Sequence, residues 1–225
     1  MKKQKTFQHF FLAFSVIVFL ITCKKEDDSN VIIDGDGNVY SSVKIGNQEW
    51  LTENLKTTRY NDGTPIPVLK QNEDWYNVNG PACCWYNNDS VGNEVYGLLY
   101  NLYAVSSPKL CPKGWHIPTE NEWKELFTYL GGEKIASNKL KEPGNAHWLS
   151  VSSDVTNETG FTALPGGYRG YEGNFGSLRF FGYWWAAPFG TSDHSSTVCM
   201  SYDCGEIYWG AHIGEIGLSV RCVKN

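Results

Sequence analysis

Only one segment of the chain, residues 119–130, has the apolar periodicity of a long amphipathic helix. Thr119 and Glu122 form a Thr-x-x-Glu capping box directly after Pro118, and such a box hydrogen-bonds the free amides at a helix start. Apolar residues follow at i, i+3, i+4 and i+7, namely Trp123, Leu126, Phe127 and Leu130. Gly131 and Gly132 end the helix. No other segment sustains this periodicity, and the chain cannot be a coiled coil.

The remaining apolar runs are short and are separated by turn residues. A second, shorter helix is predicted over residues 133–141, ended by Pro143 and Gly144. Residues 34–50 have the pattern of successive hairpins, and residues 203–206 occupy the place of another hairpin turn. Short β-rich runs occur at 161–164, 183–187, 197–202, 207–211 and 218–223. The sequence therefore predicts an α+β domain, with one or two helices packed on a small, much-looped antiparallel sheet.

Residues 1–22 have the organisation of a bacterial signal peptide. Three lysines precede an apolar run over residues 10–21, which is too short to cross a bilayer as a stop-transfer helix. Leu20-Ile21-Thr22-Cys23 resembles a lipobox, in which the cysteine becomes the lipidated first residue of the mature chain. We therefore expect Cys23 to carry a lipid that holds the protein on a membrane. A plain signal peptide cleaved nearby is the alternative.

A charged segment without apolar residues, residues 23–30, follows the leader and is predicted to be a tether. Its lysines followed by acidic residues resemble the signal that sends Bacteroidota lipoproteins to the outside of the outer membrane. Residues 31–225 are then a single domain. The leader holds three of the 19 basic residues and none of the 24 acidic ones, so the mature chain is acidic and a nucleic acid is not expected as a partner.

Motifs of the common catalytic and metal sites are missing from the sequence. Residues 34–38 read Asp-Gly-Asp-Gly-Asn, but an EF-hand would need Gly where Val39 stands and Glu where Ile45 stands. A glycine-rich turn is expected there. The histidines lack zincin spacing, and His116 is expected to form a structural hydrogen bond. We therefore predict no metal, no cofactor and no enzymatic activity.

Several motifs resemble the Fibrobacter succinogenes major paralogous domain family. They begin with Val-Lys-Ile-Gly-Asn-Gln-Glu-Trp-Leu-Thr-Glu-Asn-Leu at residues 43–55 and end with Ser-Val-Arg-Cys-Val-Lys at residues 219–224. Between them the matching stretches are 84–89, 96–101, 110–119, 122–123, 160–169 and 184–185. Together they cover essentially all of residues 31–225. The resemblance implies a surface-anchored or secreted bacterial protein with a C-type-lectin-like domain, and it implies no established reaction.

Two further expectations come from the resemblance to lectin-like domains. Their last strand is stapled to an earlier segment, so by analogy Cys111 pairs with Cys222, although six cysteines allow 15 pairings. Calcium-dependent lectins use a Glu-Pro-Asn or Gln-Pro-Asp tripeptide, whereas this chain has Glu142-Pro143-Gly144. A calcium-bridged sugar site is therefore disfavoured.

Aromatic residues in polar, Asn- and Gly-rich segments are the candidate ligand-binding surface. We expect a non-enzymatic binding or adhesion domain for an extracellular polysaccharide, surface polymer or surface protein, because aromatic faces stack on sugar rings while amides and carboxylates bond hydroxyls. The candidates are Trp75, Tyr76, Trp85, Tyr86, Asn87, Asn88 and Asp89. The alternative is that the rings fill a core, which is the role expected of Trp115, Trp123, Trp184 and Trp185.

Cys199 and Cys204 support a different hypothesis. Their spacing and the following strand are similar to the end of formylglycine-generating enzymes, where two cysteines hold copper(I), a metal that soft thiolates select. The competing interpretation is a disulfide, but on one extended strand these residues would be roughly 16 Å apart, beyond disulfide reach. A copper-dependent enzyme and a purely structural surface protein thus stay open as alternatives to a binding domain.

Overall fold

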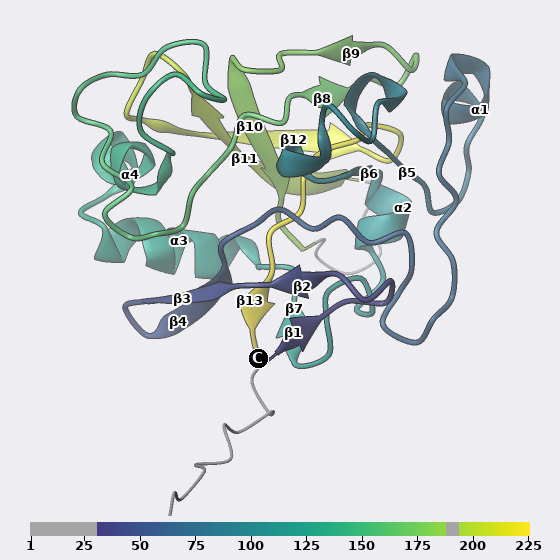
Figure 1. The fold of residues 1–225 in the computed structure, drawn as a ribbon, viewed down its shortest axis with the longest axis horizontal. Coiled ribbons are helices and arrows are strands. Elements are labelled where there is room, and N and C mark those ends of the chain that lie inside the picture. The colour runs from purple at the N-terminus through teal and green to yellow at the C-terminus, as the bar shows by residue number, and fades with distance from the viewer. Residues whose placement is uncertain (1–30, 188–193) are drawn as a thin grey trace, which may run out of the picture. The chain divides into compact units, whose positions relative to one another are not determined.

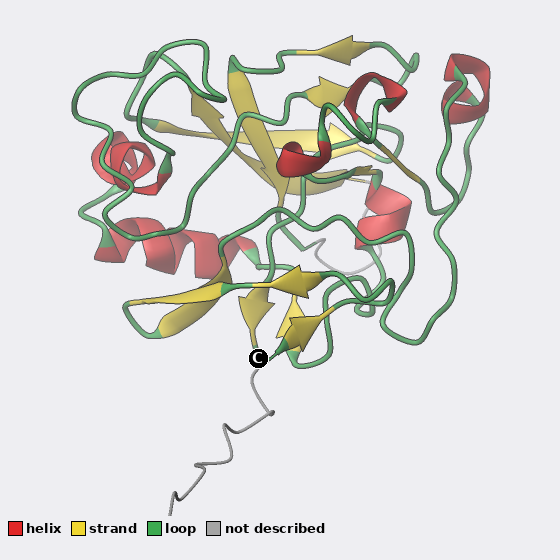
Figure 2. Cartoon of the chain, in the orientation of Figure 1, coloured by secondary structure: helices red, strands yellow, loops and turns green. Residues whose placement is uncertain are grey.

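The computed structural model describes residues 31–187 and 194–225. The predicted signal peptide, the lipidation site Cys23 and the tether lie outside the described residues. Val31–Asn225 cluster into one compact unit, in which much of the chain between the elements is loop (Figures 1 and 2). The helices are α1 (Asn72–Tyr76), α2 (Leu102–Val105), α3 (Glu120–Tyr129) and α4 (Glu133–Leu140), with single 3₁₀ turns η2 (Tyr86–Asn88) and η3 (Glu94–Tyr96).

The strands form small antiparallel sheets. One sheet has the order β10-β11-β12 and another the order β3-β4-β13-β7, while β1 and β2, β5 and β6, and β8 and β9 pair as two-stranded ribbons. Their bounds are β1 (Ile32–Ile33), β2 (Val39–Tyr40), β3 (Ser42–Ile45), β4 (Gln48–Leu51), β5 (Cys83–Cys84), β6 (Leu99–Tyr100), β7 (Trp115–His116), β8 (Tyr168–Arg169), β9 (Phe175–Gly176), β10 (Phe181–Trp185), β11 (His194–Ser201), β12 (Ile207–Ile213) and β13 (Val223–Lys224). The α+β class predicted from the sequence is confirmed.

The predicted elements agree best with the structure where local signals are strong. The Thr119 capping box is complete, since the Thr119 hydroxyl accepts from the Glu122 amide and the Glu122 carboxylate accepts from the Thr119 amide. The predicted turn at residues 203–206 joins β11 to β12. The strand expected at 161–164 is wrong, because Thr162 has a φ of 54°, which breaks an extended strand. In the run at 218–223, Leu218 and Ser219 form isolated bridges and β13 begins only at Val223.

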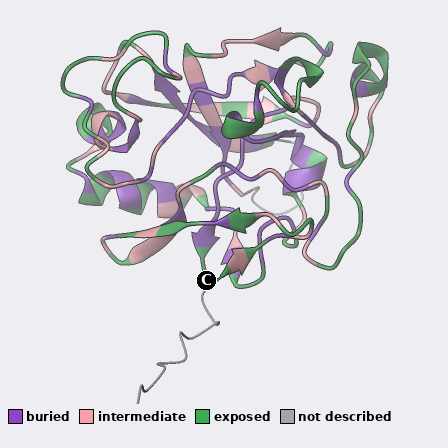
Figure 3. Cartoon of the chain, viewed as in Figure 1, coloured by how far each residue is buried: buried purple, intermediate pink, exposed green. Residues whose placement is uncertain are grey.

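One face of the β10-β11-β12 sheet is covered by α3 and α4. The register aligns Trp184 with Val198 and Trp209 across the three strands, and Val198 and Trp184 are buried in one cluster with Trp123 and Leu140 of the helices. Figure 3 shows buried residues on β10 and β11, whereas most of β12 is intermediate or exposed. The four tryptophans predicted to be core, Trp115, Trp123, Trp184 and Trp185, are all buried.

The predicted disulfide is confirmed. Cys111 and Cys222 are bonded, with their Cα atoms 6.1 Å apart. Cys111 precedes β7 and Cys222 precedes β13, and these two strands are themselves paired. The bond therefore fixes the C-terminal strand to a segment more than 100 residues earlier in the chain.

A fully buried arginine joins the segments around the same C-terminal strand. The Arg221 guanidinium donates to the carbonyl oxygens of Leu51 (2.9 Å) and Phe161 (2.7 Å) and to Oδ1 of Asn54 (2.9 Å). Its plane lies 4.3 Å from the centre of the Phe161 ring. Burial lowers the pKa of Arg221. The hydrogen bonds offset this cost of burial, because each buried carbonyl would otherwise be unpaired.

His116 connects β7 to α3 and to the end of the chain. Its two ring nitrogens lie 2.7 Å from Oδ1 of Asn225 and 2.8 Å from Oε1 of Glu122. The hydrogen bond to Glu122 raises the pKa of His116, against the opposing effect of partial burial. The pKa of Glu122 falls to about 2, because its bonds to His116 and Thr119 outweigh desolvation. The structural hydrogen bond expected of His116 is present.

Replacing Arg221 is expected to destabilise the fold severely. Arg221→Met should lower the free energy of unfolding by about 3 kcal/mol or more, since several buried oxygens lose a donor at about 1–3 kcal/mol each, partly offset by removal of a buried charge. Arg59→Met is the matched control, because Arg59 is half-exposed and pairs with Asp36 at the surface, a kind of pair worth at most about 1 kcal/mol. Denaturant unfolding measures both. Equal, small losses would contradict the role of Arg221.

The His116–Glu122 pair should make stability depend on pH in a defined direction. Because the folded pKa of His116 is raised, its contribution is complete below the unfolded pKa and is lost as pH rises through the folded pKa. The advantage of the wild type over His116→Gln should therefore be complete at acid pH and shrink as the pH rises above about 6.5, within about 1 kcal/mol for a partly exposed pair.

His212 provides the contrast for this measurement. Burial lowers the pKa of His212, so protonation opposes folding and the wild type should gain on His212→Gln as pH rises. Unfolding curves of the three proteins across the same pH range test both signs. Parallel curves for wild type and His116→Gln would contradict the assignment.

Candidate functional site

Two of the aromatic residues predicted to bind a ligand belong to the core. Trp75 is completely buried, and its ring N–H donates to the carbonyl of Glu215 at 2.7 Å. Tyr86 is also buried, in the same small cluster as Trp75, Cys84 and Leu99. The expectation that Trp75 and Tyr86 present their rings to a ligand is therefore wrong. Here the alternative interpretation, a core filled by aromatic rings, holds.

Arg169 holds residues 69–72, the polar segment before Trp75, against the domain. Its buried guanidinium donates to the carbonyl oxygens of Leu69 (2.7 Å), Lys70 (3.3 Å) and Gln71 (3.2 Å) and to Oδ1 of Asn72 (3.2 Å). It also lies 4.5 Å from the centre of the Trp75 ring and 4.8 Å from that of Phe175. A single side chain thus bonds three successive carbonyls before α1, and the carbonyls of Lys70 and Gln71 also accept from Asn88 and from the Trp75 amide.

Glycine is required where the β8–β9 hairpin approaches α1. Gly173 has a φ of 87°, and a Cβ at this position would lie 2.6 Å from Cα of Asn72, which real side chains do not tolerate. This close approach brings the loop between β8 and β9 against the start of α1. Residues 72–76 and 168–176 therefore form one end of the domain, and α1, β8 and β9 all lie in the upper part of Figure 1.

Tyr76 and Tyr171 remain exposed at this end. Their side chains are 58% and 51% exposed, and the two phenols are close enough to influence one another electrostatically. The Tyr171 hydroxyl donates to Oε1 of Glu172 at 3.1 Å, and this bond raises the pKa of Tyr171. Tyr76 was among the residues predicted from sequence. Tyr171 was missed, although it follows the family-like Gly-Gly-Tyr-Arg stretch by two residues.

Partly buried rings lie on β8 and β10, and those of Tyr168 and Tyr183 also pack against the main apolar cluster. Tyr168 and Tyr183 meet edge to face with ring centres 5.9 Å apart, and Phe181 stacks on Tyr183 at 5.7 Å. Phe175 contacts Tyr86 at 5.2 Å. Sequence reasoning assigned Tyr183 to a strand and gave it no binding role, because alternation alone does not show which face of a small sheet is covered. We call Tyr76, Tyr168, Tyr171, Phe181 and Tyr183 the aromatic surface.

The remaining candidates, residues 85–89, lie on a strained turn beside the aromatic surface. Trp85 is partly buried, and Asn87, Asn88 and Asp89 are exposed. Asn87 and Asn88 have φ values of 50° and 58°, a conformation that Asn tolerates better than most residues. The Asn88 amide donates to the carbonyl of Lys70 at 2.9 Å, and Asp89 accepts from two backbone amides of its own turn. The structure brings Asn88 to the segment held by Arg169.

The exposed charge at this end is predominantly negative. In the segments 69–89 and 168–178, all of which the structure describes, Lys70 is the exposed basic residue, and Glu73, Asp74, Asp89 and Glu172 are the exposed acidic ones. Arg169 is buried, and its guanidinium donates to backbone carbonyl oxygens. An anionic ligand would be repelled here, whereas a neutral or amine-bearing ligand would not.

The two cysteines of the copper hypothesis lie on either side of a tyrosine. Cys199 is opposite Tyr208 in the β11–β12 register, and the sulfur of Cys204 is 3.4 Å from the Tyr208 hydroxyl. Both are free thiols, as are Cys83 and Cys84, among the residues described. Burial raises the pKa of Cys199 and of Cys84 to about 12, so these thiols are protonated at neutral pH.

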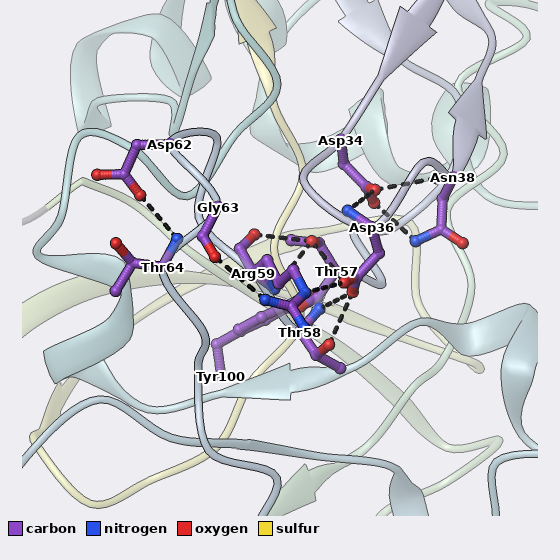
Figure 4. A network of polar contacts seen from close by, with 10 residues as sticks. All are labelled: Asp34, Asp36, Asn38, Thr57, Thr58, Arg59, Asp62, Gly63, Thr64 and Tyr100. Carbon is purple, nitrogen blue, oxygen red and sulfur yellow. Dashed lines mark hydrogen bonds and ion pairs between the residues drawn. The ribbon is translucent and has the colours of Figure 1, made fainter.

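The aspartate turn at residues 34–38 is the centre of a network of hydrogen bonds, which Figure 4 shows. Asp34 accepts from the Asp36 and Asn38 amides and from the Tyr40 hydroxyl. Asp36 accepts from the Thr58 amide and hydroxyl and pairs with Arg59 at 3.2 Å. The glycine-rich turn expected from sequence is present. Within residues 31–187 and 194–225, no three His, Cys, Asp or Glu side chains form a group that could hold a metal ion.

Comparison with known proteins gives one family. The model of the Fibrobacter succinogenes major domain matches residues 43–224, which include every strand from β4 to β13 and both buried arginines. No curated protein and no solved structure matches the chain. No helix in the described part of the chain is long and apolar enough to cross a membrane. The match covers most of the chain, and the protein belongs to the Fibrobacter succinogenes major domain family.

Proposed function

We propose that the protein is a surface lipoprotein whose domain binds an extracellular polysaccharide without catalysing a reaction. The observation that carries this proposal is the aromatic surface, in which Tyr76 and Tyr171 are exposed and the partly buried rings of Tyr168, Phe181 and Tyr183 pack on one another. Rigid, half-buried rings bind at a low entropic cost, because packing already restricts them. A surface protein is the alternative ligand for the same surface. A purely structural role is the alternative to ligand binding.

The position of the aromatic surface supports a role in adhesion. Figure 1 places α1, β8 and β9 at one end of the domain and β1, the first described strand, at the other. We propose that Cys23 carries the lipid anchor on the outer membrane, facing the cell exterior. The aromatic surface includes two exposed rings, Tyr76 and Tyr171, which a polymer outside the cell can contact.

The charge of the aromatic end narrows the ligand class. Exposed Glu73, Asp74, Asp89 and Glu172 outnumber the exposed basic residues Lys70 and Arg179 and disfavour uronic-acid and sulfated polymers. Neutral hexose and pentose polymers, or polymers of amino sugars, fit this surface better. The proposal is therefore binding to a neutral or amine-bearing polysaccharide.

The finer fold class is also a proposal. We infer a C-type-lectin-like domain, and the support is the combination of a late strand stapled through Cys111–Cys222, a three-stranded sheet backed by two helices, and long loops between residues 52 and 114. The aromatic surface would occupy the loop-rich side of such a domain. A solved structure of the domain would test this assignment by direct superposition on lectin-like folds.

Retention on immobilised polymers tests the binding proposal. The mature protein should be retained by at least one of cellulose, xylan, mannan and chitin, and not by alginate or pectin. Tyr76→Ala with Tyr171→Ala should weaken retention by about 5- to 30-fold, the effect of losing about 1–2 kcal/mol. Both residues are exposed, so stability should change little.

Tyr129→Ala is the matched control, because Tyr129 on α3 is also exposed but lies away from the aromatic surface. It should bind like the wild type. If the folded protein is retained by no polymer, carbohydrate binding is wrong and a protein ligand or a structural role takes its place. If all three substitutions weaken binding alike, the location of the site is wrong.

A copper(I)-thiolate enzyme is the second candidate function, and the two free thiols flanking Tyr208 favour it. Copper would have to displace the proton of Cys199, whose pKa is raised to about 12, so binding would strengthen with pH. Alkylation followed by intact mass, with and without copper(I), tests it. Under our main proposal, copper(I) does not change the alkylation of either thiol. Protection of Cys199 and Cys204 by one copper ion would instead establish a metal site.

A further inference from the structure

The last strand of the three-stranded sheet has one edge without a partner in the described part of the chain. β12 lies at the end of the order β10-β11-β12. No backbone hydrogen bond leaves β12 for a described residue outside β11, apart from a turn bond in which the Ile216 amide donates to the Ile213 carbonyl. The opposite edge of the sheet is paired, because Ser219 forms a bridge to Trp184 of β10. The outward backbone groups of β12 are therefore left to water or to another molecule.

β12 also lacks the features with which proteins protect a sheet edge. Short edge strands, lysines, prolines and bulges discourage pairing with other chains. The other strands at sheet edges in residues 31–187 and 194–225 are two to five residues long, whereas β12 has seven. Its sequence, Ile-Tyr-Trp-Gly-Ala-His-Ile, contains no Lys, Arg, Asp, Glu or Pro, and its pairing with β11 has no bulge. β12 is therefore open to the addition of a further strand.

One face of β12 is packed on α3 and α4. The Trp209 ring meets Phe127 of α3 edge to face, with 5.9 Å between ring centres, and its N–H donates to Oε1 of Glu133 on α4 at 2.6 Å. Tyr208 and Ile213 nevertheless remain 45% and 44% exposed. The strand is thus held in an extended conformation before any partner binds, so pairing costs little conformational entropy.

We propose that β12 pairs antiparallel with β12 of a second copy of the chain, which joins two three-stranded sheets into one sheet of six strands. The pairing is centred on Gly210, so Ile207 lies opposite Ile213 of the second copy and Tyr208 lies opposite His212. Residues directly opposite one another share a face and stabilise the strand pair. Each of these pairs occurs twice, because the axis is two-fold. The exposed Ile213 side chain thereby gains an apolar partner.

The charges that flank β12 favour this register. Glu206 precedes the strand and Glu215 follows it. In the proposed register Glu206 lies beside Gly214 of the second copy, and Glu215 lies beside Gly205. A shift by one residue would place Glu206 against Glu215, and parallel pairing would place each glutamate against its own copy. Like charges directly opposite destabilise a strand pair, so both alternatives are disfavoured.

An extended segment of another protein is the competing occupant of this edge. Residues 205–215 begin with Gly-Glu-Ile and end with Ile-Gly-Glu, so the segment complements itself in its apolar and charged positions. This self-complementarity favours a second copy. None of the residues of the aromatic surface belongs to β12, and the inference does not depend on the polysaccharide proposal.

Analytical ultracentrifugation of the mature chain tests the proposal. All proteins carry Cys23→Ser, which prevents lipidation, and Cys204→Ser, which prevents an intermolecular disulfide at this partly exposed thiol. The weight-average mass should rise from one chain towards two between about 1 μM and about 1 mM, the range of small and transient interfaces. Ile213→Lys should weaken association about tenfold or more, because it places an ammonium group against the buried Ile207 of each copy.

Ile33→Lys is the matched control, because Ile33 also lies on a strand and is 49% exposed, but belongs to the β1–β2 ribbon. It should associate like the wild type. Hydrogen exchange of the wild type locates the contact independently of any variant. The outward amides of β12 should exchange several-fold more slowly at high than at low protein concentration, whereas exchange in β10 should not change.

The following outcomes would overturn the proposal. A mass of one chain over the whole range, with β12 amides that exchange equally at all concentrations, would exclude a second copy. A mass of two chains that Ile213→Lys leaves unchanged, or that Ile33→Lys abolishes, would place the interface elsewhere. Unfolding curves check that both variants are folded, as expected for exposed side chains. If Ile213→Lys does not fold, hydrogen exchange of the wild type decides.

Discussion

Two buried guanidinium groups hold this fold together. Arg221 binds carbonyl oxygens of residues 51, 161 and 162, and Arg169 binds those of residues 69, 70 and 71. Each group therefore joins chain segments about 60 to 170 residues apart in sequence. An arginine fork can satisfy several carbonyls at once, which is what a chain with few long strands requires. Aromatic rings of Phe161 and Trp75 cover the guanidinium planes and complete their burial.

The scarcity of regular structure makes these side-chain bonds necessary. Loops cross the interior between short strands, and each buried backbone carbonyl there needs a donor that a sheet would otherwise provide. Arg221 lies next to Cys222, so the disulfide to Cys111 and the guanidinium hub fix the same stretch before β13. The aromatic core packs around the two buried guanidinium groups. Rings that stack on them, such as Trp75 and Phe161, are not available to a ligand.

The two ends of the domain have different chemistry and suit different contacts. The end built on Arg169 exposes tyrosines and carboxylates, a combination suited to hydroxyl-rich polymers. The end where the described chain begins exposes aliphatic side chains of the β1–β2 ribbon, among them Ile33 and Val39.

The sequence by itself determined the features that depend on local signals. The capping box set the start of α3 at Thr119, Gly131 and Gly132 set its end, and turn residues separated β11 from β12. The α+β class followed from these elements, and the resemblance to the family supplied the Cys111–Cys222 pair. Only the tertiary structure decided which aromatic rings are exposed. Trp75 and Tyr76 are neighbours in the same polar segment, yet Arg169 stacks on Trp75 and buries it, while Tyr76 points outward. Burial of a ring depends on a partner almost 100 residues away, and no local pattern records that partner.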